Sequence, residues 1–301
     1  MAETREKTGD SNRITREYLD SLLLETRYIG STGSSTEFTL FGRRFETPVM
    51  TSALSHLDHF VHPGAMAELA RGAKDAGAVM WMGMAETEEV AACAATGADI
   101  VEIIKPYADR DQIYKRIEQA QKLGLLAVGI DIDFVYDAAG EPKNFHGHPL
   151  REVTEAELTE LASYAKASGL PFIVKGILSR QDAAAALRAG ADGLVVSHHG
   201  YSLEYAVPPL FMLPILTCEE SLKSVYFVDC EIRTGMDAYK AIALGASGVC
   251  VGRPLMQAIR ENGAAGVTEY LKKATAELKK AMAATGCRTL AKIDDSVIYR
   301  L

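Results

Sequence analysis

The sequence has no excess of basic residues. Of its 301 residues, 32 are Lys or Arg and 40 are Asp or Glu, which gives a formal net charge of -8. Nucleic acids and anionic membranes attract basic surfaces, so we expect neither to be the main partner. The expected partner is a small-molecule substrate.

Long apolar runs and cysteine motifs are also absent. No segment contains the roughly 18 consecutive apolar residues that a membrane-spanning helix requires. Residues 1–13 are polar and charged, unlike the apolar region of a signal peptide. None of the five cysteines forms a CxxC pair, which argues against a disulfide framework and a cysteine zinc site. We therefore expect a soluble, cytoplasmic protein.

Short apolar runs alternate with Ala-rich segments along the chain, and hydrophobic residues make up 48% of it. Helical spacing of apolar residues occurs in segments that include 64–76, 87–96, 110–122, 154–168, 180–189 and 236–244. The β-rich runs cover residues 48–53, 78–83, 98–105, 125–133, 171–177, 193–199, 224–232 and 248–254. Eight such strands predict an α/β fold, a parallel (β/α)8 TIM barrel, with an open doubly wound sheet as the alternative.

The pattern predicts a single domain with a short extension before it. Residues 1–40 form the predicted N-terminal extension, in which residues 18–28 read as a short amphipathic helix, and residues 41–301 form the barrel. A helix from about Pro254 to Thr285 is expected near the end of the chain. The stretch 134–153 is long for a loop after a strand, which favours a lid over the site.

Polar side chains stand where the predicted strands end, and catalytic groups collect at these ends in parallel barrels. A histidine beside an aspartate makes a tunable general base, and a nearby lysine stabilises developing negative charge. The set therefore predicts proton abstraction, with a phosphate site after strands seven and eight. Its members are Lys105, Asp131, Asp133, Lys175, Ser197, His198, His199, Asp229, Arg233, Gly252 and Arg253.

Three segments resemble the FMN-dependent 2-hydroxy-acid dehydrogenase and oxidase family, which includes glycolate and lactate oxidases. They read IVKGILSRQDAAAALRAGADGLVVSHHG, VDCEIRTGMDAYKAIALGASGVCVGRP and ATGCRTLAKI. The resemblance runs from about Phe41 to the end of the chain and is strongest from Pro171 onward. It implies a barrel with FMN at its mouth, oxidation of a small hydroxylated substrate with hydride transfer to the flavin, and a homo-oligomer.

The resemblance also assigns roles to single residues. It implies that His199 takes a proton from the substrate hydroxyl, that Asp131 pairs with this histidine, and that Lys175 stabilises the reduced flavin. The implied FMN contacts are Lys175, Ser197, Asp229, Arg233, Gly252, Arg253, Ala53, Ser55 and Gly83. The expected substrate contacts are Lys105, His198 and Ser202.

Several positions depart from the family pattern. The stretch after the histidine reads GYSLEY and lacks the arginine that binds a substrate carboxylate, which is either replaced by Ser202 or deleted. A serine does not replace a bidentate guanidinium group. Lys105 stands where the family has a tyrosine, and Cys230 and Glu231 replace the paired glycines of the phosphate loop. We expect Glu231 to be unfavourable beside a phosphate unless its side chain turns away.

Other interpretations remain open at this level. One is an isomerase or lyase that uses reduced FMN without net redox turnover, and another is a flavin-binding protein without catalysis. A metal site among His56, His59 and His62, with Asp58 nearby, is the less favoured interpretation of these residues, because no recognised ligand spacing is complete. We predict no metal.

Overall fold

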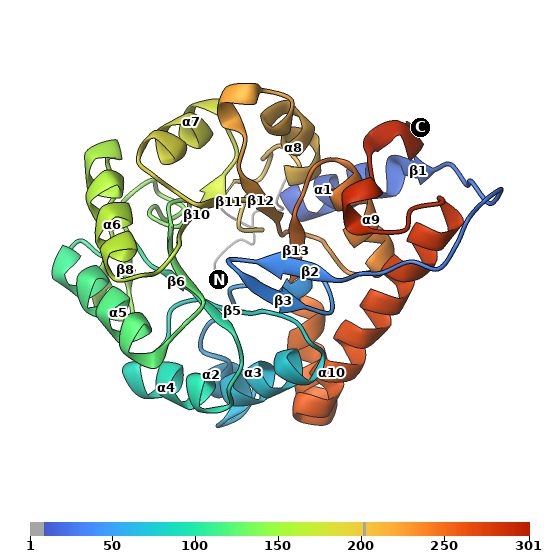
Figure 1. The fold of residues 1–301 in the computed structure, drawn as a ribbon. Helices are drawn as coiled ribbons and strands as arrows, with labels where there is room; N and C mark the ends of the chain where they lie inside the picture. Colours follow the sequence, from blue (N-terminus) through green and yellow to red (C-terminus); the bar gives the residue numbers. More distant parts are fainter. Residues whose placement is uncertain (1–8, 201–202) are drawn as a thin grey trace, which may run out of the picture.

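The computed structural model describes residues 9–200 and 203–301, and eight parallel strands form its centre (Figure 1). In chain order they are β4 (Val49–Thr51), β5 (Met80–Met82), β6 (Ile100–Ile104), β7 (Ala127–Asp131), β10 (Phe172–Ile177), β11 (Gly193–Val196), β12 (Val225–Val228) and β13 (Gly248–Val251). Their order in the sheet is β4-β13-β12-β11-β10-β7-β6-β5. The edge strands β4 and β5 meet through a parallel bridge between Leu54 and Met82. The sheet is therefore a barrel, which confirms the predicted fold against the doubly wound alternative.

Apolar side chains fill the barrel, and a hairpin covers the end at which its strands begin. The hairpin strands β2 (Phe38–Leu40) and β3 (Arg43–Phe45) pair antiparallel and lie across the barrel opening in Figure 1. Phe38 and Phe45 belong to the same buried cluster as Trp81 and Phe227, whose rings meet edge to face at 4.8 Å. The barrel interior is thus packed and covered at the N-terminal ends of its strands, and active sites of such barrels lie at the opposite end.

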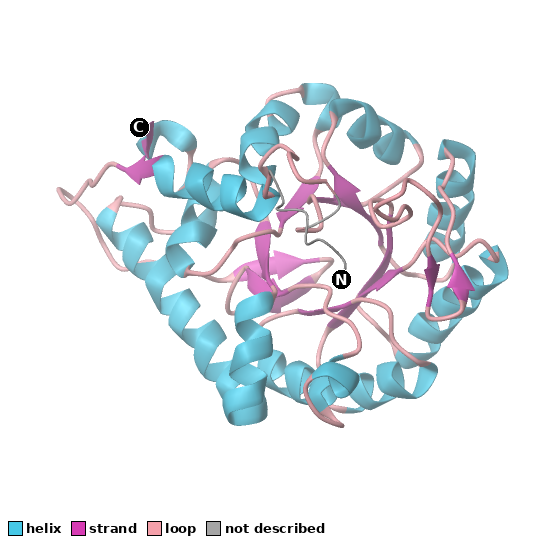
Figure 2. Cartoon of the chain, turned by 180° about the vertical axis from the view of Figure 1, so that it is seen from behind, coloured by secondary structure: helices cyan, strands magenta, loops and turns pink. Residues whose placement is uncertain are grey.

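Helices surround the strands, as Figure 2 shows from the other side. They are α2 (Leu57–Phe60), α3 (Ala65–Asp75), α4 (Thr87–Ala95), α5 (Arg110–Leu123), α6 (Glu155–Ala167), α7 (Arg180–Arg188), α8 (Pro209–Thr217), α9 (Gly235–Ala243) and α10 (Arg253–Ala284). The six helical segments named from the sequence all coincide with one of these. The expected final helix is interrupted: Asn262 has a φ of -150° and Gly263 a φ of 53°, so α10 consists of two helical parts joined at a kink.

The N-terminal helix lies earlier than the sequence pattern predicted. It is α1 (Ser11–Ser21), and the side chain of Asp10 caps it by accepting hydrogen bonds from the backbone N–H groups of Asn12 and Arg13. Residues 22–24 form strand β1 (Leu22–Leu24), which pairs antiparallel with β14 (Ile298–Arg300). The predicted bounds of 18–28 were wrong. The helix begins earlier because Asp10 caps it, and it ends at Ser21 because Leu22–Leu24 pair with β14.

The long segment after β7 folds over the mouth of the barrel. It contains the short antiparallel strands β8 (Asn144–Phe145) and β9 (His148–Pro149). Phe145 from this hairpin lines the main cavity. Within residues 9–200 and 203–301, no helix is both long and apolar enough to cross a membrane.

Candidate active site

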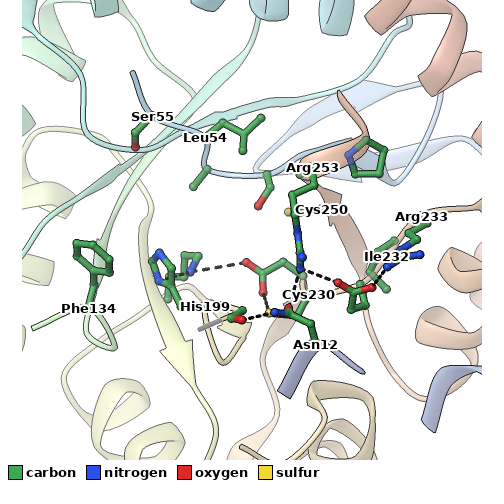
Figure 3. A pocket seen from close by; sticks show the side chains of 18 of the residues that line it. Asn12, Leu54, Ser55, Phe134, His199, Cys230, Ile232, Arg233, Cys250 and Arg253 are labelled. Carbon is green, nitrogen blue, oxygen red and sulfur yellow. Dashed lines mark hydrogen bonds and ion pairs between the residues drawn. The ribbon is translucent and has the colours of Figure 1, made fainter. Parts of the chain in front are cut away.

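A cavity of about 700 Å³ opens at the carboxyl ends of the barrel strands (Figure 3). Phe134 and His199 lie at one end of it, and Arg233 and Arg253 at the other. The site residues named from the sequence that line it are Ala53, Ser55, Lys105, Lys175, His199, Asp229, Arg233, Gly252 and Arg253. They come from the ends of six different strands, which is how a parallel barrel gathers distant residues into one site.

His199 lies in the loop after β11, with its ring between a carboxylate and an aromatic ring. Its Nδ1 is 2.8 Å from Oδ1 of Asp133, and its ring stacks on Phe134 at 4.9 Å between centroids. Because a carboxylate only accepts, this contact assigns a proton to Nδ1 and leaves the lone pair of the neutral ring on Nε2. His199 therefore has the orientation of a general base.

The acid closest to His199 is Asp133 and not the predicted Asp131. Asp131 Oδ2 lies 3.5 Å from His199 Nδ1, and the same oxygen accepts a hydrogen bond from Lys105 at 2.6 Å. Asp131 is the last residue of strand β7, and Asp133 follows it in the loop. The predicted pairing is thus shared: Asp133 makes the direct hydrogen bond, while Asp131 adds negative charge behind it.

Electrostatics favour the charged form of His199. Burial and the nearby Lys175 lower the pKa of His199, but Asp131 and Asp133 raise it by more, so it lies above the usual 6.5. Burial would raise the pKa of Asp131, yet the neighbouring cations, Lys105 first, hold it well below 3.8. The site therefore stabilises a proton on His199 once one has been taken up.

Lys175 sits between this acid–base pair and the middle of the cavity. Its Nζ is 3.3 Å from Ser197 Oγ and 3.6 Å from Asp229 Oδ2. Burial lowers the pKa of Lys175, but the surrounding carboxylates, Asp131 foremost, raise it well above 10.5. Lys175 is consequently a permanent cation with its charge directed at the cavity.

Two glycines shape the backbone near these groups. Gly176 has a φ of 99° where the pairing of β10 with β11 shifts register, and a Cβ there would lie 2.7 Å from the side chain of Asp133. Gly83 does not line the cavity; it packs beneath it, where a Cβ would lie 2.8 Å from the carbonyl oxygen of Ala53. Glycine at 176 therefore allows Asp133 to approach the strand that carries Lys175.

The far end of the cavity carries two guanidinium groups and a carboxylate. Arg233 and Arg253 both project there, and both donate hydrogen bonds to Glu231. Arg253 also donates to Oδ1 of Asn12 at 2.6 Å, which brings α1 over this end of the site. The predicted phosphate-binding arginines are thus together, but they already hold an anion of the chain itself.

Three predicted contacts have other outcomes. His198 does not face the cavity: its Nε2 is 2.7 Å from Thr15 Oγ1 of α1, and its Nδ1 accepts from the N–H of Gly200. The prediction that His198 binds substrate was therefore wrong, because His198 is held by Thr15, while the left-handed backbone of His199, with a φ of 58°, turns the chain there. Ser197 lies buried under Lys175, and Ser202 lies outside the described residues.

Sequence reasoning missed the aromatic wall of the site. The ring of Phe134 stacks on His199 and lies under two ammonium groups, Lys105 at 3.8 Å and Lys143 at 3.5 Å from its centroid. Phe145 contacts Phe134 edge to face at 5.1 Å. The only signal for this wall was the unusual length of the segment 134–153, which predicted a lid without identifying its residues.

Two of the residues considered for a metal site after β4, Asp58 and His62, have other partners. Asp58 caps α3 by accepting from the N–H groups of Gly64 and Met66, and His62 lies 3.4 Å from Glu68. In the part of the chain that the structure describes, the group with ligand atoms close enough for a metal is Asp131, Asp133 and His199. Lys105 and Lys175 already neutralise its carboxylates.

Comparison with known sequences gives a family match over nearly the whole chain. The family described as FMN-dependent dehydrogenase matches residues 2–156 and 137–300. Glycolate oxidase 1 of Oryza sativa subsp. indica is 30% identical over 294 residues, covering 87% of this chain and 79% of the relative. The glycolate oxidase of Spinacia oleracea is 29% identical over 293 residues, covering 86% and 79%.

Comparison with solved structures agrees. A mandelate oxidase variant with (S)-mandelic acid superposes with a TM-score of 0.87 at 28% identity, covering 98% of this chain and 91% of that one. A second structure of such a variant, with a C4a-OH-FMN adduct, has a TM-score of 0.87 at 27% identity and covers 98% and 94%. The strand ends that form the cavity here thus belong to a fold that holds a flavin in a similar protein.

Proposed function

Because this chain belongs to the family of FMN-dependent dehydrogenases, we propose that it oxidises a small hydroxylated substrate with His199 as the base. The chain is an FMN-dependent oxidoreductase, and FMN is its cofactor. The observation that carries the proposal is the hydrogen bond between His199 and Asp133 at the cavity wall, beside the buried cation of Lys175.

The residues along the cavity fit FMN. Lys175 offers a cation for the flavin ring, Asp229 offers acceptors for the ribityl hydroxyls, and Arg233 and Arg253 offer guanidinium groups for the phosphate. The misfit is at the phosphate end, where the carboxylate of Glu231 must leave the arginines. When bound, FMN supplies a two-electron acceptor.

His199 and the acids behind it handle the proton. Nε2 accepts the proton of the substrate hydroxyl, and Nδ1–H remains bonded to Asp133. The resulting imidazolium is stabilised by Asp133 and Asp131, and Phe134 covers one face of the ring. Phe145 and Leu54 add apolar lining, so this end of the cavity limits the access of water.

Charge balance bears on the substrate. Three carboxylates, from Asp131, Asp133 and Asp229, surround two ammonium groups. Lys105 is bound to Asp131 at 2.6 Å, so this carboxylate already balances its charge. Lys143, over the ring of Phe134, is a third ammonium group at this end of the cavity. Among the described residues beside His199, the cations are thus lysines, and none has the two parallel N–H groups with which a guanidinium clamps a carboxylate. We therefore propose a hydroxylated substrate other than a simple 2-hydroxy acid.

The test is an anaerobic absorption spectrum of the flavin-loaded protein, recorded as compounds are added in matched pairs. Glycolate is compared with ethylene glycol, and mandelate with 1-phenyl-1,2-ethanediol. We expect bleaching of the flavin by a hydroxylated compound, and faster bleaching by the uncharged member of a pair. A flavin that no hydroxylated compound bleaches contradicts the oxidase function, and preference for the acids contradicts the substrate class.

We propose a homo-oligomer, on the family resemblance, and a location in the cytoplasm. Light scattering coupled to size-exclusion chromatography tests the first, and a monomeric mass contradicts it. Imaging of a tagged chain in its native cell tests the second.

A further inference from the structure

Glu231 places its carboxylate between the two arginines at the far end of the cavity. Oε1 accepts a hydrogen bond from Arg253 Nη2 at 2.6 Å, and Oε2 accepts one from Arg233 Nη2. The side chain of Glu231 is 2% exposed, whereas the side chains of Arg233 and Arg253 are 54% and 61% exposed. The carboxylate is the buried member, and the guanidinium groups reach it from the solvent side.

The backbone fixes Glu231 in this position. Cys230 and Glu231 have φ values of 65° and 62°, in the left-handed region that disfavours side chains and favours glycine. Arg16 of α1 donates to the carbonyl oxygen of Glu231 at 3.0 Å and pairs with Asp237 at 2.9 Å. A turn suited to two glycines thus carries an acidic side chain, and α1 holds it from behind.

A carboxylate and a phosphate use the same recognition chemistry here. Guanidinium groups bind both through charge-assisted hydrogen bonds, and Glu231 already uses the Nη2 group of each arginine. A phosphate placed beside the ionised carboxylate would meet a like charge at short range, where little water screens it. The phosphate of FMN therefore competes with Glu231 for these donors, and it gains the full charge of both arginines when Glu231 leaves them.

We propose that Glu231 determines the cofactor specificity of this site by acting as an internal anion that competes with the phosphate of FMN for Arg233 and Arg253. This inference rests on the proposed function, because it takes a flavin as the cofactor. The phosphate then adds little to binding, and riboflavin, which lacks the phosphate but shares the ring and the ribityl chain, binds about as tightly as FMN.

The first experiment measures dissociation constants of FMN and riboflavin by quenching of flavin fluorescence. The proteins are the unmodified chain, Glu231→Gln, Glu231→Gly and the control Glu269→Gln, which removes an exposed acid from α10. We expect both Glu231 variants to bind FMN about 10- to 100-fold more tightly, the range for one charge-assisted hydrogen bond. Riboflavin binding should be unchanged in all four proteins.

A second experiment uses inorganic phosphate and needs no flavin. Binding to the folded state alone raises the unfolding temperature, so phosphate should stabilise Glu231→Gln and Glu231→Gly but neither the unmodified chain nor the control. Sodium chloride at equal ionic strength corrects for screening. Circular dichroism shows whether each variant is folded, and the glutamine variant keeps the test valid if the glycine variant unfolds.

The outcomes separate the two proposals. If FMN and riboflavin bind but the Glu231 variants gain no affinity for FMN and no stabilisation by phosphate, the role of Glu231 is overturned while the flavin function stands. If phosphate stabilises the variants but neither flavin binds any of the four proteins, the carboxylate does occupy an anion site, and the flavin function is overturned.

Discussion

At the residue scale, the chemistry depends on how two carboxylates share one histidine. Asp133 makes the short hydrogen bond to His199, and Asp131 lies behind it with Lys105. Both aspartates raise the pKa of His199, against burial and Lys175, which lower it. A base with a raised pKa is protonated over a wider acidic range, so its activity should be lost at a higher pH than for an ordinary histidine.

The raised pKa of His199 predicts how flavin reduction depends on pH. The rate should fall as pH drops through the pKa of His199, at a value above 6.5, because the imidazolium cannot accept a proton. Stopped-flow measurement of anaerobic bleaching between pH 5 and 9 checks this. A rate that is independent of pH across that range would contradict the role of His199 as base.

Replacing Asp133 should slow flavin reduction and shift the pH at which its rate falls. Asp133→Asn removes negative charge that stabilises the imidazolium, so we expect flavin reduction to slow by about 10²- to 10⁴-fold, as for the loss of acid–base function. The pH at which activity is lost should also decrease, because the pKa of His199 falls. Asp137→Asn, at an exposed position of the same loop, is the control and should change neither quantity. A slower rate with no shift in the pH at which activity is lost would assign Asp133 a structural role only.

At the element scale, α1 links the extension to the mouth of the barrel. Its polar contacts with the site include those of Thr15 with His198, of Asn12 with Arg253, and of Arg16 with the backbone of Glu231. Each partner follows one of the last three barrel strands, His198 and Glu231 in loops and Arg253 as the first residue of α10. The helix therefore orders the loops that shape the cavity, although it precedes the barrel in the sequence.

The buried contact of Thr15 gives a stability prediction for this helix. Thr15→Val keeps the side-chain shape but leaves Nε2 of His198 without its partner, which should lower the free energy of unfolding by about 1–3 kcal/mol. Urea denaturation followed by circular dichroism measures the change. Thr39→Val on the exposed face of β2 is the matched control, expected to change stability by less than about 0.5 kcal/mol. Equal effects of both substitutions would show that the contact with His198 does not anchor α1.

At the scale of the whole molecule, the last strand of the chain pairs outside the barrel with the strand that follows α1. Strand β1 follows α1 directly and pairs with β14 through Leu22–Leu24 and Ile298–Arg300. The backbone of Leu301 also donates to Ser21 at 3.1 Å. The position of α1 over the cavity is thus secured at its C-terminal end by the last residues of the chain.

Deleting residues 298–301 should therefore affect both stability and the site. The loss of the β1–β14 pairing should cost about 2–4 kcal/mol, at about 1 kcal/mol for each backbone hydrogen bond. Flavin binding should also weaken, because α1 loses this attachment. Urea titration and flavin fluorescence measure the two effects, with deletion of Leu301 alone as the milder comparison. Unchanged flavin affinity in a destabilised, folded truncation would contradict the coupling.

The sequence by itself determined the barrel and the edge at which chemistry occurs. Eight apolar strands separated by amphipathic helices must be buried on both faces, and parallel strands bring their carboxyl ends to one side. For that reason Lys175, His199, Asp229 and Arg253 could be placed at one cavity without coordinates. The flavin contacts and their individual roles came from the family resemblance.

The tertiary structure decided which of these side chains meet. Asp131 and Asp133 are two residues apart, and only the path of the chain after β7 brings Asp133 to the Nδ1 atom of His199. The outward turn of His198 depends on Thr15, which lies 183 residues away in the sequence. The position of Glu231 between two arginines depends on a strained turn and on loops from two strands. Such contacts arise from packing between distant segments, which local sequence patterns do not encode.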